Sequence, residues 1–325
     1  MKQSVMSKKS RILIYIIFIV LIFIGLLVFF LLKSQTGNDK NTVSENKKLQ
    51  VVTTLFPLYD FAKNIGQDKV QVTLLLPPGV EAHSFEPKPS DVLLINKADI
   101  FIYTGKFMEP WAEDIIKSIT NKNLVVVNAS NGINLISAVF NNPDEPAGSI
   151  DPHIWLDFDN DKMIVNSIAA AFVKKDPENK SFYEKNAKEY NLQLTDLDKD
   201  YKSALSLCKS KEIIYAGHYA FGYLAKRYGL KYLTAQGVSP DAEPTANDLI
   251  NLVNQIKKDN IKYIFYEELA SPKIAETLSK ETGAKLILLN AAHNISKEQL
   301  EKGITFISIM KSNLENLKIG LEYKQ

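Results

Sequence analysis

Short apolar runs alternate with amphipathic segments through most of this chain, and the alternation limits the folds open to it. Runs of strand character lie at 51–55, 70–76, 99–105 and 124–127, and EIIYA, KYLTA, YIFYE and KLILL follow later. Most of these runs lead into a helical pattern. Such an order is typical of parallel sheets with helices on both faces. The sequence therefore predicts an α/β fold made of two lobes of βα repeats.

A longer helical pattern separates the two series of strands. From about Phe182 to Leu207, apolar side chains recur every three or four positions. The 3.6-residue period of an α-helix places them on one face. The stripe is too short to favour a coiled coil, so we expect one helix that crosses the backs of both lobes. The stripe consists of Tyr183, Ala187, Tyr190, Leu194, Leu197, Tyr201 and Leu205.

The amino terminus differs in character from the rest of the chain. Residues 12–32 carry no charge, and several basic residues precede them. An apolar stretch of this length can span a bilayer, and preceding basic residues favour the cytoplasm for the first segment. We expect a cytoplasmic segment at 1–11, an uncleaved transmembrane signal anchor at 12–32 and a polar, flexible tether at 33–48. The alternative is cleavage at a site the sequence does not reveal, which would leave a secreted protein.

Composition excludes several classes of protein. The net charge is only +2, and no basic cluster with interleaved aromatic residues suggests a nucleic-acid partner. Cys208 is the single cysteine, so an intramolecular disulfide is impossible and an extracellular body must be stabilised by its core. We expect Cys208 to be buried and the body to be monomeric.

Histidine is rare in this chain and distinctively placed. The four histidines are His83, His153, His218 and His293, and three of them follow apolar strand-like runs. Open α/β sheets bind ligands at the carboxyl ends of their strands. Neutral imidazole is a common zinc ligand, and four protein ligands complete a tetrahedron. Each histidine alone is compatible with a core or capping role, but together they predict a metal site.

Longer motifs carry a family resemblance over essentially the whole body. They are TTLFPLYDFAKNIG, LLLPPGVEAHSFEPKPSD, DPHIWLD, AGHYAFGYLAKRYGL and QGVSPDAEPTANDL. The chain resembles the bacterial substrate-binding proteins of zinc and manganese ABC transporters, the cluster A-I solute-binding proteins, and within them the zinc-type subgroup. The resemblance implies two lobes joined by a single long rigid helix, with one metal ion in the interlobe cleft. The implied limits are 49–181 for the N-terminal lobe, 182–207 for the linking helix and 208–325 for the C-terminal lobe.

The resemblance also implies the ligands. The histidine of AHSFEP is His83 and that of DPHIWLD is His153. His218 occupies a third position that is often glutamate in manganese-type members. The fourth position is usually an aspartate or glutamate after the last strand, whereas LLNAAHNIS stands here and places His293 there. Alternatives for this position are water and the carboxylates Glu267 and Glu268.

Ligand chemistry favours zinc, because nitrogen donors suit zinc and an oxygen-rich set suits manganese. Four neutral imidazoles bring no negative charge to the ion. Affinity then depends on hydrogen-bond acceptors that orient the rings. Candidate acceptors are Glu86, Asp157, Glu267 and Glu268, each with a helix cap, a salt bridge or another structural role as its alternative.

Two classes of function remain. The resemblance implies an extracellular substrate-binding protein that captures a divalent metal ion and delivers it to an ABC-transporter permease in the same membrane. Zn²⁺ is the expected cargo, with manganese or iron as alternatives. A zinc metalloenzyme would need an open coordination position and a base, and neither H-E-x-x-H nor G-x-S-x-G occurs in the sequence. We expect no enzymatic activity, and a cell-adhesion role is a further alternative.

Overall fold

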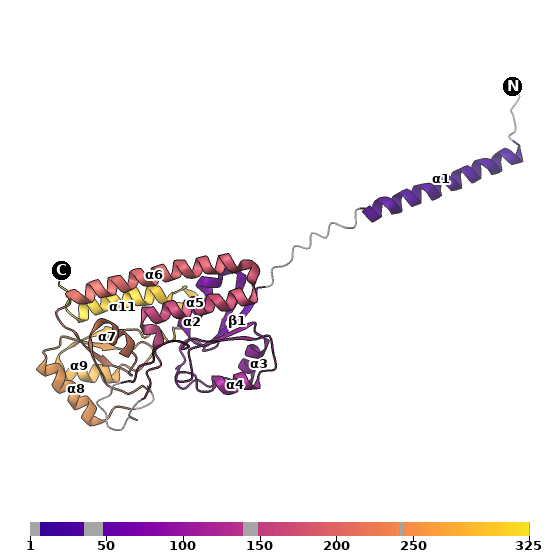
Figure 1. The fold of residues 1–325 in the computed structure, drawn as a ribbon. Coiled ribbons are helices and arrows are strands. Elements are labelled where there is room, and N and C mark those ends of the chain that lie inside the picture. Colours follow the sequence, from indigo (N-terminus) through magenta and orange to yellow (C-terminus); the bar gives the residue numbers. More distant parts are fainter. Residues whose placement is uncertain (1–6, 36–47, 139–148, 239, 241–242, 325) are drawn as a thin grey trace. The chain divides into compact units, whose positions relative to one another are not determined.

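The computed structural model describes residues 7–35, 48–138, 149–238, 240 and 243–324 (Figure 1). The chain divides into two units, Met1–Lys47 and Lys48–Gln325, which we describe separately. In the first unit, α1 (Lys8–Gln35) contains a stretch, Lys8–Leu31, that by length and composition could cross a membrane. This helix covers the predicted span at 12–32. Most of the predicted tether at 33–48 lies outside the described residues.

The second unit, the body, contains two four-stranded parallel sheets of equivalent strand order. The first has the order β2-β1-β3-β4 and consists of β1 (Leu49–Thr53), β2 (Val70–Leu74), β3 (Ile100–Tyr103) and β4 (Val125–Asn128). The second has the order β6-β5-β7-β8 and consists of β5 (Glu212–Ala216), β6 (Lys231–Thr234), β7 (Tyr263–Tyr266) and β8 (Lys285–Leu288). Every predicted strand is present, and the predicted fold class is confirmed.

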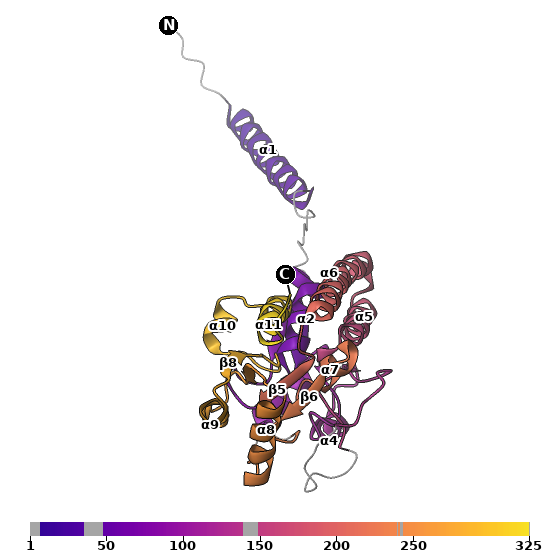
Figure 2. The ribbon, with the colours of Figure 1, turned by 90° about the vertical axis from the view of Figure 1, so that its left-hand side faces the viewer.

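Helices connect and cover these strands (Figures 1 and 2). Those of the first lobe are α2 (Phe56–Gly66), α3 (Pro89–Lys97), α4 (Ala112–Ser118) and α5 (Phe158–Lys175). Those after β5 are α7 (Gly222–Tyr228), α8 (Ala246–Lys258), α9 (Lys273–Thr282), α10 (Lys297–Glu301) and α11 (Phe306–Gly320). Short 3₁₀ turns are η1 (Gln67–Lys69), η2 (Ile154–Leu156) and η3 (Pro177–Asn179).

The predicted linking helix is α6 (Lys180–Leu207). It runs along both lobes, from the end of the body that holds α3 and α4 to the end that holds α8 and α9 (Figure 1). It packs on α5, α2 and α11. All seven residues of the predicted apolar stripe are buried in it: Tyr183, Ala187, Tyr190, Leu194, Leu197, Tyr201 and Leu205.

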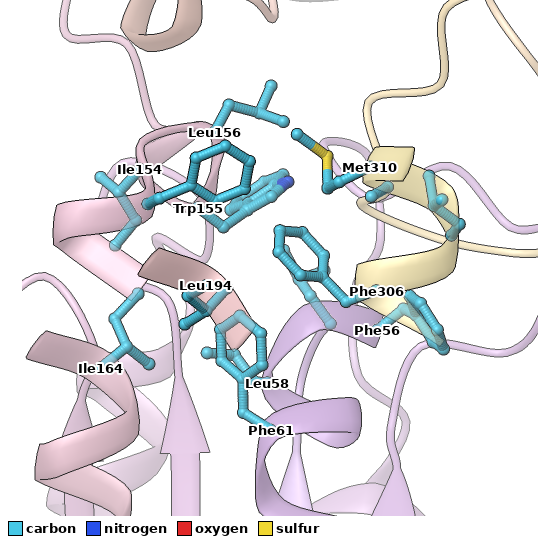
Figure 3. Packing of buried hydrophobic residues seen from close by; sticks show 14 of the residues in the cluster. Phe56, Leu58, Phe61, Ile154, Trp155, Leu156, Ile164, Leu194, Phe306 and Met310 are labelled. Carbon is cyan, nitrogen blue, oxygen red and sulfur yellow. The ribbon is translucent and has the colours of Figure 1, made fainter. Parts of the chain in front are cut away.

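One hydrophobic core continues from the first lobe into the second. Phe56 and Phe61 of α2 meet Trp155 of η2 and Phe306 of α11 at the junction (Figure 3). The rings of Phe61 and Phe306 lie edge to face with their centroids 5.1 Å apart. Because α11 follows the last strand of the second sheet yet packs on α2 of the first lobe, apolar contacts join the two lobes.

A buried carboxylate lies beneath the linking helix. Asp60 of α2 accepts a hydrogen bond of 2.9 Å from the Tyr190 hydroxyl of α6. Burial raises the pKa of Asp60 from 3.8 to about 6, although the bond from Tyr190 partly opposes this. The folded chain therefore binds this proton more tightly than the unfolded chain does. It follows that folding stability is lost as the pH rises from the unfolded pKa through the folded pKa.

We expect Asp60→Asn to remove this pH dependence. Between pH 4 and pH 7 the free energy of unfolding of the parent should fall relative to the variant by about 2–3 kcal/mol. Urea unfolding at a series of pH values measures the difference, and any constant cost of the substitution cancels. Asp196→Asn, at an exposed position of α6, is the control and should track the parent. If the free energies of unfolding of Asp60→Asn and the parent differ by the same amount at every pH, the prediction is wrong.

Candidate metal site

Three histidine rings converge where the two lobes meet. His83 follows β2 of the first sheet, His153 directly precedes η2, and His218 follows β5 of the second sheet. The Nε2 atom of His153 lies 3.2 Å from Nε2 of His83 and 3.1 Å from Nε2 of His218. Nitrogen ligands at 2.0–2.1 Å from a tetrahedral zinc ion lie about 3.3–3.4 Å from one another. Both separations from the His153 nitrogen are thus close to what one tetrahedral ion requires, and the ligand atoms of all three histidines lie within 4.8 Å of one another.

Two of these rings form a hydrogen bond to a carboxylate through Nδ1, the nitrogen on the side away from the other histidines. Nδ1 of His153 donates to Asp151 Oδ1 at 2.8 Å, and Nδ1 of His218 donates to Glu267 Oε2 at 2.9 Å. These bonds assign the ring proton to Nδ1 and leave the Nε2 lone pair free on both histidines. Lone pairs that face each other at such short range repel unless a cation lies between them. The arrangement therefore favours a bound cation.

His293 completes a second group of ligand atoms. Its ring centroid lies 5.6 Å from that of His218. Within the described residues, two groups have their ligand atoms within 4.8 Å of one another: His83 with His153 and His218, and His218 with Glu267 and His293. His293 is buried, and its Nδ1 has no hydrogen-bond partner among the described residues. The structure thus gathers all four predicted histidines and adds Glu267, so the identity of the fourth ligand stays a prediction.

Burial favours the neutral form of the imidazoles of His83, His153 and His293. It is the main cause that lowers the pKa of His83 and of His153, and the neighbouring imidazoles lower both further. Burial also lowers the pKa of His293. It raises the pKa of Asp151, which favours the uncharged acid in a site without metal. At neutral pH these three rings therefore offer lone pairs rather than protons to an incoming ion.

Two glycines allow the carboxylates to approach their histidines. An added Cβ at Gly217 would lie 2.7 Å from Glu267 Oε2, and one at Gly222 would lie 2.4 Å from Asp151 Oδ2. Both distances, from the added Cβ to a carboxylate oxygen, are shorter than the 3.0 Å below which Cβ atoms essentially never approach another heavy atom. Glycine at these two positions is therefore a requirement of the hydrogen bonds that orient His218 and His153.

Among the predicted acceptors, Glu267 receives a hydrogen bond from a site histidine. Asp157 instead caps α5 by accepting from the Asp159 amide, and it forms an ion pair of 2.7 Å with Arg227. Glu268 accepts from Gln299, and Glu86 is exposed.

These contacts correct the expectation for Asp157, because the imidazole proton of His153 goes to Asp151. Asp151 is fully buried and lies two residues before its histidine. Asp151 is not among the acceptors predicted from the sequence. An aspartate within the apolar stretch SIDPHIWL was the signal available.

We expect Glu267→Gln to weaken zinc binding by roughly 10–100-fold, the range typical when a partner of a metal ligand is altered. Glutamine keeps the size of the side chain but removes the charge that supports the His218 proton. Glu268→Gln is the matched control, because the neighbouring carboxylate contacts Gln299 and should leave affinity within about twofold. Competition titration with a zinc chelator measures both variants. Equal losses of zinc affinity in the two variants would contradict the prediction. A loss of more than about 100-fold in Glu267→Gln would indicate that Glu267 is itself a ligand of the metal.

Comparison with known proteins places the chain in a family. The family model described as ZnuA, zinc-uptake complex component A periplasmic, matches residues 51–320. The chain is 44% identical to the high-affinity zinc uptake system protein ZnuA of Bacillus subtilis, over 91% of this chain and 95% of that protein. The chain belongs to this family of substrate-binding proteins, as its motifs predict.

Solved structures agree. The metal-dependent lipoprotein YcdH of Bacillus subtilis superposes with a TM-score of 0.74 at 46% identity, covering 84% of this chain and 99% of that one. The Zn(II)-bound ZnuA-like domain of AdcA from Streptococcus pneumoniae superposes with a TM-score of 0.74 at 37% identity, covering 85% and 99%. Both comparisons support the two-lobed fold with its long helix.

Proposed function

We propose that this protein captures one zinc ion outside the cell and passes it to the permease of an ABC transporter. The observation that carries the proposal is the convergence of His83, His153 and His218 from both lobes, with the two Nε2 separations from His153 close to the spacing of ligands on a tetrahedral ion. Membership of the zinc-uptake family supports the same role. The nitrogen-rich donor set favours zinc over manganese. In this role the ion is cargo and the protein is not catalytic.

Within this proposal, His83, His153 and His218 bind the ion and His293 is the fourth ligand. The buried Nδ1 atom of His293, without a partner among the described residues, supports this choice. Glu267 is the alternative, because its carboxylate lies in the same group of ligand atoms as His293. We also propose a monomer with lobes at 49–181 and 208–325 joined by the helix at 182–207.

Metal titration of the full chain in detergent tests the proposal. We expect one zinc ion per chain and a rise in thermal stability, since binding to the folded state stabilises it by mass action. Manganese, added in parallel, should give the smaller rise. Two tight sites, or a larger stabilisation by manganese than by zinc, would overturn the assignment.

We further propose that α1 remains attached as a membrane anchor. A related protein is named a lipoprotein, whereas the single cysteine of this sequence, Cys208, is buried in the body and does not lie near α1 in the sequence. We expect the native protein to fractionate with membranes, to keep its full amino-terminal mass and to take up no labelled fatty acid. Mass spectrometry of the protein from washed membranes tests this. A mature chain that begins within 33–48 would show that the segment is cleaved.

A further inference from the structure

The segment that carries His293 is bound to the first lobe, although it follows the last strand of the second. Between β8 and α10 the chain turns back across the junction. There the Trp155 indole Nε1 donates to Ala291 O at 2.8 Å, and the Phe56 amide donates to His293 O at 3.3 Å. Ala292 has a φ of 59°, a left-handed conformation that an L-residue adopts only when its surroundings enforce it. The path of this segment therefore depends on contacts made outside its own lobe.

Asn294 makes the most specific of these contacts. Its side chain is buried, and Nδ2 donates to Pro77 O at 2.9 Å and to Val80 O at 2.7 Å. Its Oδ1 accepts from the Ile295 amide at 2.8 Å. Next to it, the Gly79 amide donates to Ile295 O at 3.0 Å. Both amide hydrogens of Asn294 thus bind one turn of the first lobe, and no shorter or purely apolar side chain could replace them.

The turn at Pro77–Val80 leads directly into the segment that carries His83. Asn294 is the neighbour of His293. The Asn294 side chain therefore connects the segment of His293, the proposed fourth ligand, to the segment of His83. The two segments are more than two hundred residues apart in sequence. Loss of its amide would remove the hydrogen bonds to the Pro77 and Val80 carbonyls and leave only the Gly79–Ile295 hydrogen bond of those described above, so the separation of the turn and the His293 segment would be less firmly fixed.

We propose that Asn294 is a positioning residue that fixes the separation of the His83 and His293 segments and thereby sets how long the protein retains zinc. This inference rests on the proposed function. Asn294 does not touch the ion. It acts through the two histidine segments, so its loss should raise the rate of zinc dissociation more than it changes association.

The test compares Asn294→Ala and Asn294→Asp with a matched control, Asn186→Ala, in the full chain in detergent. Asn186 is also buried, and its Nδ2 also donates to a distant main-chain carbonyl, Ile65 O at 2.9 Å, but it lies on the linking helix. Three measurements are made on each protein. They are hydrogen exchange of residues 77–83 without metal, zinc dissociation into excess chelator, and the visible spectrum of the Co²⁺-loaded protein.

We expect both Asn294 variants to exchange faster at 77–83 and to release zinc roughly 10–100-fold faster, with a weakened tetrahedral Co²⁺ band. Asn186→Ala should lose comparable thermal stability but match the parent in all three measurements. Asn294 variants that release zinc within twofold of Asn186→Ala, or whose Co²⁺ spectrum is unchanged, would overturn the proposal. Failure of the parent itself to bind zinc would overturn the proposed function and the retention role together. Faster exchange at 77–83 would then still report the contact between the segments.

Discussion

His153→Ala should lower zinc affinity by more than about 100-fold, beyond the range seen when only a partner of a ligand is lost. His153 occupies the centre of the site, because its Nε2 lies within 3.2 Å of Nε2 of His83 and within 3.1 Å of Nε2 of His218. The substitution removes this central donor and also leaves the buried Asp151 without its imidazole partner. Competition titration of the full chain in detergent measures the loss, and circular dichroism without metal checks that the fold persists.

His293→Ala provides the comparison. Water can enter the position that this ring vacates, so we expect binding to survive but to weaken, and by less than in His153→Ala. If His153→Ala binds zinc within tenfold of the parent, the three-histidine site is wrong. If His293→Ala stays within about twofold of the parent, His293 lies outside the coordination sphere and Glu267 becomes the better fourth ligand.

Zinc affinity should change little between pH 7.5 and about 6.5 and fall steeply at lower pH. A histidine ligand binds metal only in its neutral form, and the reference pKa of histidine is about 6.5. Burial and the neighbouring imidazoles lower the pKa of His83 and of His153, and burial lowers that of His293. Protons therefore compete with zinc only below the ordinary histidine range. Because several rings must stay neutral together, affinity should fall by more than tenfold per pH unit once competition begins.

His293→Asp is the matched variant for this measurement. A carboxylate in the fourth position stays ionised through the range in which histidine gains its proton, so the decline should be shallower in the variant than in the parent. The oxygen ligand should also shift the preference somewhat toward harder metals. Affinity of the parent that is unchanged at pH 5.5, or that has already collapsed above pH 6.5, would contradict the prediction.

Sequence patterns predicted the elements of this fold closely. Apolar runs of the length of a strand and a stripe repeating at the helical period are local properties. Both sheets and α6 therefore appear where the patterns predict them. Local patterns determine helix boundaries less well, as the start of α3 shows. Ser90 is a plausible cap in sequence, yet the helix begins at Pro89, and the Asp91 carboxylate accepts from the Lys88 amide. Several caps are available within a few residues at such a boundary, and packing selects among them.

Local patterns and motifs were enough to predict the two series of βα units, the apolar amino-terminal helix, the family and the four histidines near the site. Which atoms face one another depends instead on how the segments pack. Asp151 rather than Asp157 supports His153, because Arg227 holds the Asp157 carboxylate at the start of α5. The hydrogen bond from Asn294 to the turn before His83 also depends on the return of the chain to the first lobe after β8, which no local pattern predicts. Periodicity and motifs report neighbours along the chain, whereas a metal site is made by side chains from segments that meet only when both lobes have packed on one core.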